Sequence, residues 1–261
     1  NYQDGIHAVS GAEVTVTKCT NANGDMKEIV NVSGASVVTV DGVEIKNVAK
    51  IGETYYETLA EAIKAAKAGD KVTVFAGTYA VPTMKAGITI EGEVDSEGKS
   101  TVLLEGTLSG TLENLTMKNI HIKGGNAQRW AYAKGNLVFE NVTFEATSVY
   151  ALHFDGITAG TNLTYKNCTI IGWAAMGGSP KSCVFEGCTI KDNGTYGVIR
   201  TYFDTEIKNC TFDVANAKTD DVYQDGIHAV GSAKVAVNGC TNANGERKDL
   251  VNVSGASVVT V

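Results

Sequence analysis

The chain has 261 residues, of which 43% are hydrophobic and 20% charged, so its composition is that of a globular protein rather than a disordered one. A formal net charge of −7 without any lysine or arginine cluster excludes the electrostatic footprint of a nucleic-acid-binding protein. No apolar run approaches the roughly 18 residues of a membrane span, which excludes membrane insertion by a helix.

The first 40 residues are repeated at the end of the chain. Residues 2–40 align with 223–261, and 29 of the 39 aligned positions are identical. Within 12–20 the differences fall at alternate positions, and the apolar residues between them are kept: Val14, Val16 and Cys19. This pattern is typical of strands with one buried face. We therefore expect residues 1–40 to be the C-terminal rungs of a preceding unit in a tandem array.

The octapeptide YQDGIHAV occurs in both copies, at 2–9 and 223–230. An aspartate and a histidine so close together are candidates for acid/base chemistry. Because the octapeptide is copied together with the whole segment around it, we interpret it as structural. Asp225 and Gly226 are expected to form a turn, Ile227 a core contact, and His228 a solvent-facing position.

Residues 41–55 are predicted to be a linker and entry strand, and 56–69 a capping helix. Thr58 and Glu61 form a capping box at its start, and Gly69 is the expected C-cap. Leu59 and Ile63 belong to its apolar face. A strand-like segment, KVTVFAG, follows at once. A helix in this place would cover the open end of a sheet core.

An eight-residue pattern recurs through 70–261, at 115–122, 137–144, 163–170, 183–190, 205–212 and 235–242. Repeats with a period of roughly 20–30 residues bury their apolar faces only by stacking, so they predict an all-β parallel β-helix. One position of the pattern forms a predicted core ladder: Ile120, Val142, Cys168, Cys188, Cys210 and Cys240. We interpret these cysteines as small buried hydrophobic residues, with disulfides between neighbours left open; the spacing does not suit zinc.

The entry sequence TLAEAIKAAKAGDKVTVFAGTY, followed by ITIEGE, resembles that of bacterial right-handed β-helix proteins of the pectin-lyase-like type. The resemblance covers roughly residues 51–261. It implies a right-handed parallel β-helix with an N-terminal amphipathic capping helix. It implies no single activity, because lyases, hydrolases, surface repeats and sugar-binding modules share this entry.

Pectin-lyase-like enzymes place several carboxylates, often with calcium, beside an arginine or lysine on one outer face, and their hydrolase relatives use paired aspartates. The residues available here for such a site are Asp155, Lys181, Arg200, Asp204, Asp220, Asp221 and Asp225, with His153 and His228. The Gly-His-Gly and Arg-x-Lys elements are missing, since Tyr202 stands two positions after Arg200. If the chain is an enzyme, the expected catalytic residues are Arg200, Asp204, Asp225 and Asp155.

His153 and His228 are expected to share a column, with Met176 and Ile199 between them. Three rungs separate them by about 14 Å, too far to bind one metal ion. We therefore predict no metal and no cofactor, and we favour a role without catalysis.

Aromatic residues recur in or near the second strand of successive rungs. An exposed stripe of them is suited to stack on sugar rings. The alternative is that half of them fill the core. The predicted carbohydrate-binding residues are Trp130, Trp173, Tyr196 and Tyr202, with Tyr150 nearby.

Together these patterns predict a structural repeat unit of a secreted or cell-surface bacterial protein. It would form a stiff stalk, an adhesin or a head-to-tail extracellular filament. The expected partners are further copies, bound through the unit ends, and host or cell-wall glycans. The alternatives are a glycan-binding module and a polysaccharide lyase or glycoside hydrolase.

Overall fold

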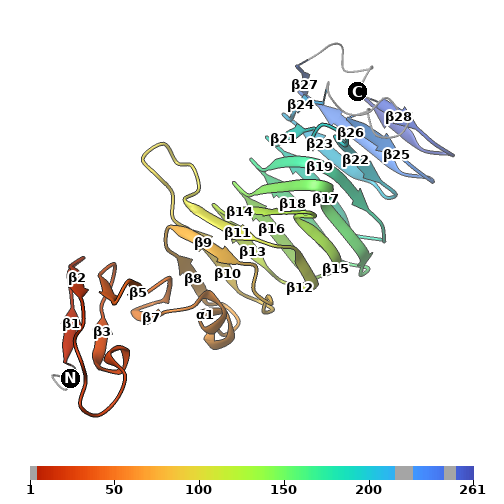
Figure 1. Ribbon diagram of the computed structural model, residues 1–261. Helices are drawn as coiled ribbons and strands as arrows, with labels where there is room; N and C mark the ends of the chain where they lie inside the picture. The colour runs from red at the N-terminus through yellow and green to blue at the C-terminus, as the bar shows by residue number, and fades with distance from the viewer. Residues whose placement is uncertain (1–4, 215–225, 244–250) are drawn as a thin grey trace.

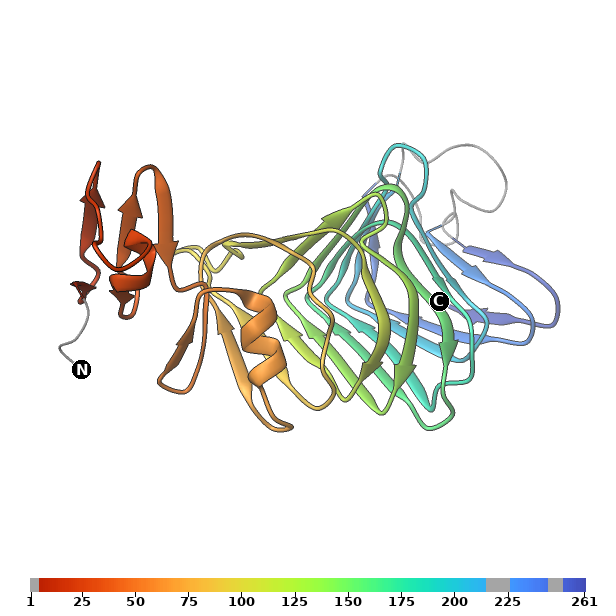
Figure 2. The same ribbon diagram turned by 60° about the horizontal axis from the view of Figure 1, so that its bottom comes forward.

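The computed structural model describes residues 5–214, 226–243 and 251–261. The chain forms an elongated β-solenoid, with a small N-terminal segment at one end and the C-terminal strands at the other (Figure 1). Viewed from another side, the turns of the solenoid lie one behind another, and helix α1 (Leu59–Ala65) lies at its N-terminal end (Figure 2).

The N-terminal segment has its own small sheets. Strand β1 (Ile6–Ala8) pairs in parallel with β3 (Val30–Val32), and β2 (Glu13–Val16) pairs in parallel with β4 (Val37–Val40). A 3-10 helix, η1 (Met26–Ile29), precedes β3, and β5 (Val43–Lys46) pairs antiparallel with β4. These strands enclose a separate apolar cluster built around Ala8, Val16, Val38 and Val40. They do not stack on the rungs of 226–261, although the two sequences match.

A hairpin and a helix then close the solenoid. Strands β6 (Ala49–Ile51) and β7 (Thr54–Tyr56) form the hairpin, and β6 pairs antiparallel with β8 (Lys71–Val74). The side chain of Thr58 accepts a hydrogen bond from the backbone N–H of Glu61, which is one half of the expected capping box, and the Thr58 hydroxyl donates to the Glu61 carboxylate at 2.7 Å. Leu59, Ala62 and Ile63 of α1 are buried in the solenoid core. The helix therefore covers the end of the core, as its apolar face predicts.

The expected helix end is wrong. Helix α1 ends at Ala65 with Ala66 as its C-cap, rather than at Gly69 within a helix over 56–69. Asp70 forms a turn with Lys67: its N–H donates to the Lys67 carbonyl, and its carboxylate accepts from the Lys67 N–H. Gly69 lies inside this turn with φ +92°, a conformation that suits glycine. The turn formed by Lys67 and Asp70 therefore replaces the last turn of the predicted helix.

Two long parallel sheets form the solenoid walls. Within the described residues the first has 11 strands, starting with β7, β6 and β8 at its N-terminal end. It continues through β10 (Thr89–Gly92), β13 (Thr116–Lys118), β16 (Asn136–Glu140), β18 (Asn162–Lys166), β20 (Ser182–Glu186), β23 (Thr205–Lys208), β26 (Lys234–Asn238) and β29 (Val258–Thr260).

The second wall has 13 strands within the same described ranges. Its main path is β9 (Gly77–Ala80), β11 (Val102–Glu105), β14 (His121–Gly124), β17 (Thr143–Ile157), β19 (Thr169–Met176), β21 (Thr189–Lys191), β24 (Thr211–Asp213) and β27 (Thr241–Asn242). Its other strands are β12 (Leu108–Glu113), β15 (Gln128–Lys134), β22 (Val198–Thr201), β25 (Ile227–Ala229) and β28 (Val251–Val253).

Each eight-residue repeat is two strands joined by a left-handed residue. That residue has φ between 52° and 64° and is Asn119, Asn141, Asn167, Gly187, Asn209 or Gly239. Asparagine and glycine tolerate this conformation better than other residues do. The Asn141 amide donates to the Asn119 side chain of the preceding rung at 3.1 Å. The corner residue of the repeat therefore forms the turn between the two strands, and at Asn141 it also links neighbouring rungs.

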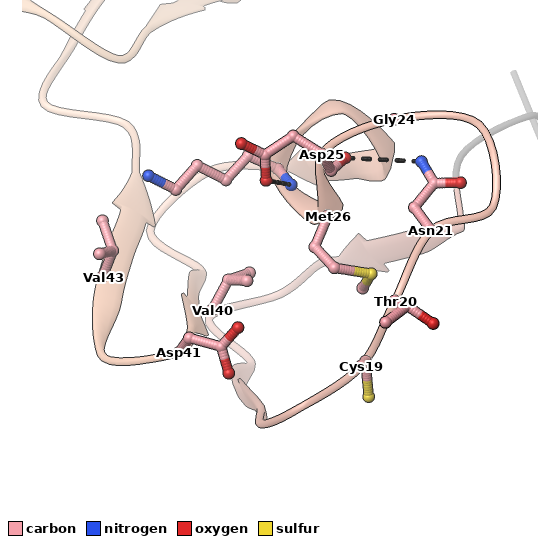
Figure 3. Close-up of a pocket in the computed structure, with 10 residues that line it drawn as sticks. Cys19, Thr20, Asn21, Gly24, Asp25, Met26, Val40, Asp41 and Val43 are labelled. Atoms are coloured by element: carbon pink, nitrogen blue, oxygen red, sulfur yellow. Dashed lines mark hydrogen bonds between the residues drawn. The ribbon is translucent and has the colours of Figure 1, made fainter.

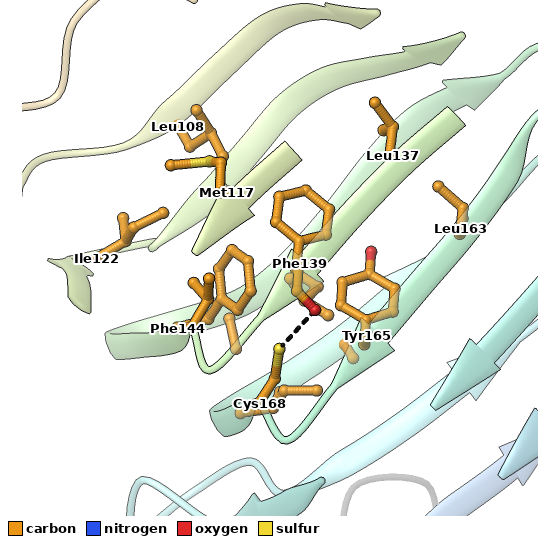
Figure 4. Packing of buried hydrophobic residues seen from close by; sticks show 14 of the residues in the cluster. Leu108, Met117, Ile122, Leu137, Phe139, Phe144, Leu163, Tyr165 and Cys168 are labelled. Carbon is orange, nitrogen blue, oxygen red and sulfur yellow. Dashed lines mark hydrogen bonds between the residues drawn. The ribbon is translucent and has the colours of Figure 1, made fainter. Parts of the chain in front are cut away.

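The core is a set of ladders along the solenoid. Phe139 and Tyr165 stack with ring centroids 5.2 Å apart (Figure 4). Tyr165 stacks in turn on Phe185, with ring centroids 4.6 Å apart. The six residues of the predicted core ladder are each at most 1% exposed, and backbone hydrogen bonds join successive rungs beside them. All six cysteines are free thiols, and only Cys19 among them is exposed. In the described ranges no helix is long and apolar enough to cross a membrane.

Candidate functional site

The outer surface of β15, β17, β19 and β22 carries most of the aromatic and arginine candidates. The strand register places His153 beside Ala175, Ala175 beside Arg200, and Arg200 beside His228. His153 and His228 thus share a column, as expected. The residues between them are Ala175 and Arg200, whereas Met176 and Ile199, expected there, are fully buried and point into the core.

Irregular backbone explains this one-residue error. Trp130 has φ 53°, and the pairing of β17 with its neighbours shifts register at three places. A β-bulge that adds one residue to one strand, as between Tyr150 and Leu152 of β17, moves the following side chains to the other face. An alignment made by constant spacing therefore assigns the wrong face beyond the bulge.

The aromatic side chains form a connected stripe. Tyr150 lies 5.2 Å from Trp173, and Trp173 stacks on Tyr196 at 5.7 Å with an interplanar angle of 16°. Trp173 is only 9% exposed, whereas Trp130 and Tyr202 are 57% and 45% exposed. Both the exposed and the buried alternative therefore hold for part of the stripe. Trp173 is packed against the solenoid, and exposed rings lie at either end of the stripe.

Two arginines lie on these rings. The guanidinium of Arg129 lies 4.5 Å from the ring centre of Trp130 and 5.2 Å from that of Tyr150. Arg200 lies 5.2 Å from Tyr202 and 5.9 Å from Trp173. Among the described residues no ion pair joins either arginine to a carboxylate. A chain of net charge −7 thus presents two cations on aromatic faces in this region.

His153 lies inside the same surface. Burial lowers the pKa of its imidazole below the usual value, and this effect outweighs the opposing effect of Asp155. The Asp155 carboxylate lies 3.3 Å from the Nδ1 atom, and nearby Arg129 lowers the histidine pKa further. The imidazole is therefore neutral at pH 7, and in the folded state it can serve as a hydrogen-bonding group rather than a cation.

The proposed catalytic residues do not converge in the described part of the chain. Asp204 accepts a hydrogen bond from the backbone N–H of Lys234 at 2.9 Å, which fixes a loop between rungs. No hydrogen bond or ion pair within the described ranges joins Arg200 to Asp155 or Asp204. Lys181 is exposed and fixes its loop through its backbone N–H, which donates to the Thr161 carbonyl. Asp220, Asp221 and Asp225 lie outside the described residues.

The described ranges contain no cluster of three or more His, Cys, Asp or Glu residues able to hold a metal ion. The candidate surface is therefore characterised by its aromatic and cationic groups.

The expectation for His228 is wrong. Its side chain is 2% exposed, and its Nε2 atom lies 2.8 Å from the Ser254 hydroxyl. The first copy has the matching pair, His7 and Ser33 at 2.9 Å, but there the histidine is exposed. Strand β22 pairs with β25 and covers the second copy, whereas no described strand occupies that place beside β1.

Arg129 and Tyr132 were not among the residues predicted from the sequence. Tyr132 is 52% exposed on the same strand as Arg129. The signal was the segment RWAYAK, in which a cation precedes alternating aromatic residues. The arrangement of these side chains depends on the irregular backbone at Trp130. The residue types of the segment do not by themselves indicate that irregularity.

A family model described as a right-handed β-helix region matches residues 63–212, more than half of the chain. The chain belongs to the right-handed β-helix family. The pectin-lyase-like fold is the usual fold of this family, in agreement with the entry sequence. Right-handed β-helix proteins include both enzymes and proteins without catalytic activity. No curated protein and no solved structure matches the chain.

Proposed function

We propose that this right-handed β-helix is a structural unit of a secreted or cell-surface bacterial protein, acting as a stiff stalk, adhesin or filament element. The observation that carries the proposal is the position of the two sequence copies. Residues 5–40 and the matching C-terminal rungs lie at opposite ends of the elongated molecule (Figure 1). A unit whose two ends have the same sequence is suited to repetition along one axis.

The mechanism is geometric. Each rung is hydrogen-bonded to its neighbours in both walls, and buried ladders run through the interior. Bending the rod would break many parallel backbone hydrogen bonds and separate stacked side chains at the same time. A stack of this kind spans distance without flexible joints inside the solenoid.

The proposal is tested on intact cells that produce the protein. Immunogold labelling with an antibody against the chain should decorate the outer surface or extracellular fibres. The control is an antibody against a cytoplasmic protein, which should label only broken cells. Labelling confined to the cell interior would contradict the proposal.

A second candidate function is glycan binding, which the aromatic–arginine surface favours. Exposed rings at Trp130 and Tyr202, each with an arginine on its face, provide stacking surfaces and hydrogen-bond donors for sugars. A glycan array should show binding that Trp130→Ala and Tyr202→Ala reduce. The matched control is Tyr55→Ala, which removes a partly exposed ring from β7 in the other wall of the solenoid. Equal binding by all variants, or none by the original chain, would remove this candidate.

A further inference from the structure

Charged residues on the outer face of the first wall neutralise one another from rung to rung. One outward column of this wall alternates in sign through Glu91, Lys118, Glu140, Lys166, Glu186 and Lys208. Lys118 forms an ion pair with Glu140 at 2.8 Å. Opposite charges on neighbouring strands stabilise the sheet and leave little net charge to attract a ligand.

The second wall departs from this pattern where its outer surface carries arginine. The strand register places an alanine and His228 beside Arg200, so neither neighbouring strand brings a carboxylate opposite it. Burial lowers the pKa of His153, which therefore adds no positive charge at pH 7. Asp155 lies 3.3 Å from the His153 imidazole and forms no ion pair with Arg200 or Arg129 within the described ranges. The two guanidinium charges are thus uncompensated in the described part of the surface.

The rings beside each arginine fix the orientation of its guanidinium. Arg129 lies over Trp130 and Tyr150, and Arg200 lies over Tyr202 and one further ring. These contacts use the face of the guanidinium and leave its in-plane N–H groups free of the rings. The Nε atoms of both arginines are buried and have no hydrogen-bond partner in the structure as described. The terminal N–H groups of each arginine therefore form a fixed fork suited to an oxyanion.

Trp130 has a backbone conformation that opposes folding. Its φ is 53°, in the left-handed region, where a bulky side chain is strained. Its ring is 57% exposed, so burial of the ring offsets little of this strain. Strained backbone conformations are concentrated at ligand-binding positions. The strain and the exposure together indicate that the Trp130 ring contacts a ligand.

The two arginines are separated along the axis of the solenoid. Arg129 belongs to β15 and Arg200 to β22, and β17 and β19 lie between these strands. At about 4.8 Å for each step between strands, the separation is roughly 14 Å. Tyr150 and Trp173 come from the two intervening strands, with ring centroids 5.2 Å apart. The surface therefore presents a cation, two rings and a second cation in succession along the axis.

We propose that this surface binds an extracellular glycan through sulfate ester groups, one at Arg129 and one at Arg200. This inference rests on the proposed glycan-binding function and names the charged group that is recognised. The glycan chain runs along the solenoid axis, and its sugar rings contact the exposed rings of Trp130 and Tyr202. Each guanidinium donates in-plane hydrogen bonds to the oxygens of one sulfate.

The surroundings of the arginines favour sulfate over carboxylate. Ring faces and a buried Nε atom leave each guanidinium with few water contacts. A sulfate ester spreads its charge over more oxygen atoms than a carboxylate does, so it loses less hydration free energy when it enters such a contact. A neutral sugar would leave both cations without an anion. Charge complementarity and hydration therefore point to the same class of ligand.

A cavity of about 460 Å³ in the N-terminal segment has a different character (Figure 3). Its polar groups are bonded to one another: the Asn21 amide donates to the Asp25 carbonyl at 3.5 Å, and the Asp25 carboxylate accepts from the Lys27 N–H. The Asp41 carboxylate accepts from the Lys18 N–H at 2.8 Å. These groups stabilise the loops of the segment, whereas the guanidinium forks of the second wall are available to a ligand.

The charged group is tested with one polymer in different forms: dextran, carboxymethyl dextran and dextran sulfate, the last two at equal substitution. Biolayer interferometry on the immobilised 261-residue chain measures the affinities. Dextran sulfate should bind about tenfold more tightly than carboxymethyl dextran, and unmodified dextran should bind most weakly. Equal or tighter binding of carboxymethyl dextran, or no binding of dextran sulfate, would overturn the proposal.

Substitutions test the two arginines. Arg129→Gln and Arg200→Gln should each weaken the binding of dextran sulfate by about tenfold, because each removes one anion contact. Arg200→Lys keeps the charge but loses the planar fork, so its affinity should lie between those of Arg200→Gln and the original chain. The matched control is Lys166→Gln, which removes the same charge from the first wall and should bind as the original chain does. An equal loss in Lys166→Gln would show that only the total charge matters and would overturn the site.

The separation of the arginines has a test of its own. Glucose 6-sulfate reaches one arginine, whereas a sulfated dextran oligosaccharide that spans about 14 Å reaches both and gains from the high effective concentration of its second sulfate. The oligosaccharide should therefore bind more tightly per sulfate, and Arg129→Gln should remove that advantage. Equal affinity per sulfate for the two ligands would contradict binding at both arginines. Circular dichroism and thermal unfolding check that each variant folds.

These outcomes are separable from the tests of the proposed functions. Glycan-array binding without any preference for sulfate would keep glycan binding and remove sulfate recognition. Absence of binding to every glycan would remove both. The labelling of intact cells tests the structural role independently of either result.

Discussion

At the residue scale, the side chain of Tyr165 is an exception in an otherwise apolar ladder. Its ring lies between those of Phe139 and Phe185, and its hydroxyl is buried without a hydrogen-bond partner. Burial raises the pKa of this hydroxyl well above its usual value, so it stays neutral. An unpaired buried hydroxyl opposes folding, since it loses its hydrogen bonds to water.

We expect Tyr165→Phe to increase the free energy of unfolding by about 1 kcal/mol, because it removes this unpaired group and keeps the ring. Denaturant unfolding followed by circular dichroism measures the change. The matched control is Tyr79→Phe: the Tyr79 hydroxyl donates to the Phe75 carbonyl at 2.9 Å, so its loss should destabilise the protein. A Tyr165→Phe variant less stable than the original chain would show that the hydroxyl is paired.

The cysteines should differ sharply in reactivity. A hydrogen bond with Cys168 is the main reason that the pKa of Cys188 rises to about 12, and Cys210 reaches about 12 through Cys188 in the same way. Burial raises the pKa of Cys183 further still. Because the thiolate is the reactive form, a disulfide reagent at pH 8 should modify one thiol of the native chain, Cys19. Cys19→Ser should then show none, and denaturant should expose the remaining five; several fast thiols in the native chain would contradict the buried ladder.

His153 should make stability depend on pH. Its pKa is lowered mainly by burial, so the unfolded chain takes up a proton at higher pH than the folded chain does. The stability associated with the neutral imidazole is therefore complete above about pH 6.5 and is lost as the pH falls through the lower folded value. His153→Gln should lose less stability over this interval. Parallel pH–stability curves for the two proteins would contradict the assignment.

At the element scale, the left-handed corner between paired strands decides which residues fit. Asn167 has φ 52°, and the same corner is occupied by Gly187 and Gly239 in other rungs. Alanine in this conformation costs about 1–2 kcal/mol, whereas glycine adopts it freely. Asn167→Ala should therefore lower the thermal midpoint more than Asn167→Gly does. Equal midpoints would mean that the corner imposes no conformational constraint.

The elements were predictable where the sequence repeats with a constant spacing. The apolar position from Ile120 to Cys240 marks the buried ladder because every rung returns to it through the same asparagine or glycine corner. The second strand was less predictable, since bulges near Trp130 and Tyr150 shift its register by one residue. The arginine and aromatic contacts depend on those shifts. The sequence could therefore predict which residue types form the candidate surface, but not which side chains touch one another there.

Contacts between residues far apart in the sequence also limit what the sequence can predict. His7 and His228 have the same neighbours in sequence, yet one is exposed and the other buried. The difference comes from β22, which pairs with β25 of the second copy, whereas no described strand takes the equivalent place beside β1. Local sequence carries no information about which rung precedes a segment, so identical residues receive different environments.

At the scale of the whole molecule, the described residues form two apolar clusters rather than one. The solenoid core extends from Val48 to Cys240, and the N-terminal segment encloses its own smaller cluster. The side chain of Asn47, at the junction, donates to the carbonyl of Val32 at 2.9 Å. A small cluster with few rungs has less stabilising burial than a long stack, so the two parts should unfold separately.

The duplicated sequence allows this separation to be measured with one substitution made twice. Val38→Ala removes a fully buried side chain from the N-terminal cluster, and Val259→Ala makes the identical change at a partly buried position of the C-terminal edge. We expect Val38→Ala to cost about 1–3 kcal/mol and Val259→Ala clearly less, because only the first leaves a cavity. Hydrogen exchange should show faster opening confined to residues 5–46 in the first variant and to the last rungs in the second. Faster exchange throughout the solenoid in either variant would mean that the two clusters unfold as one cooperative unit.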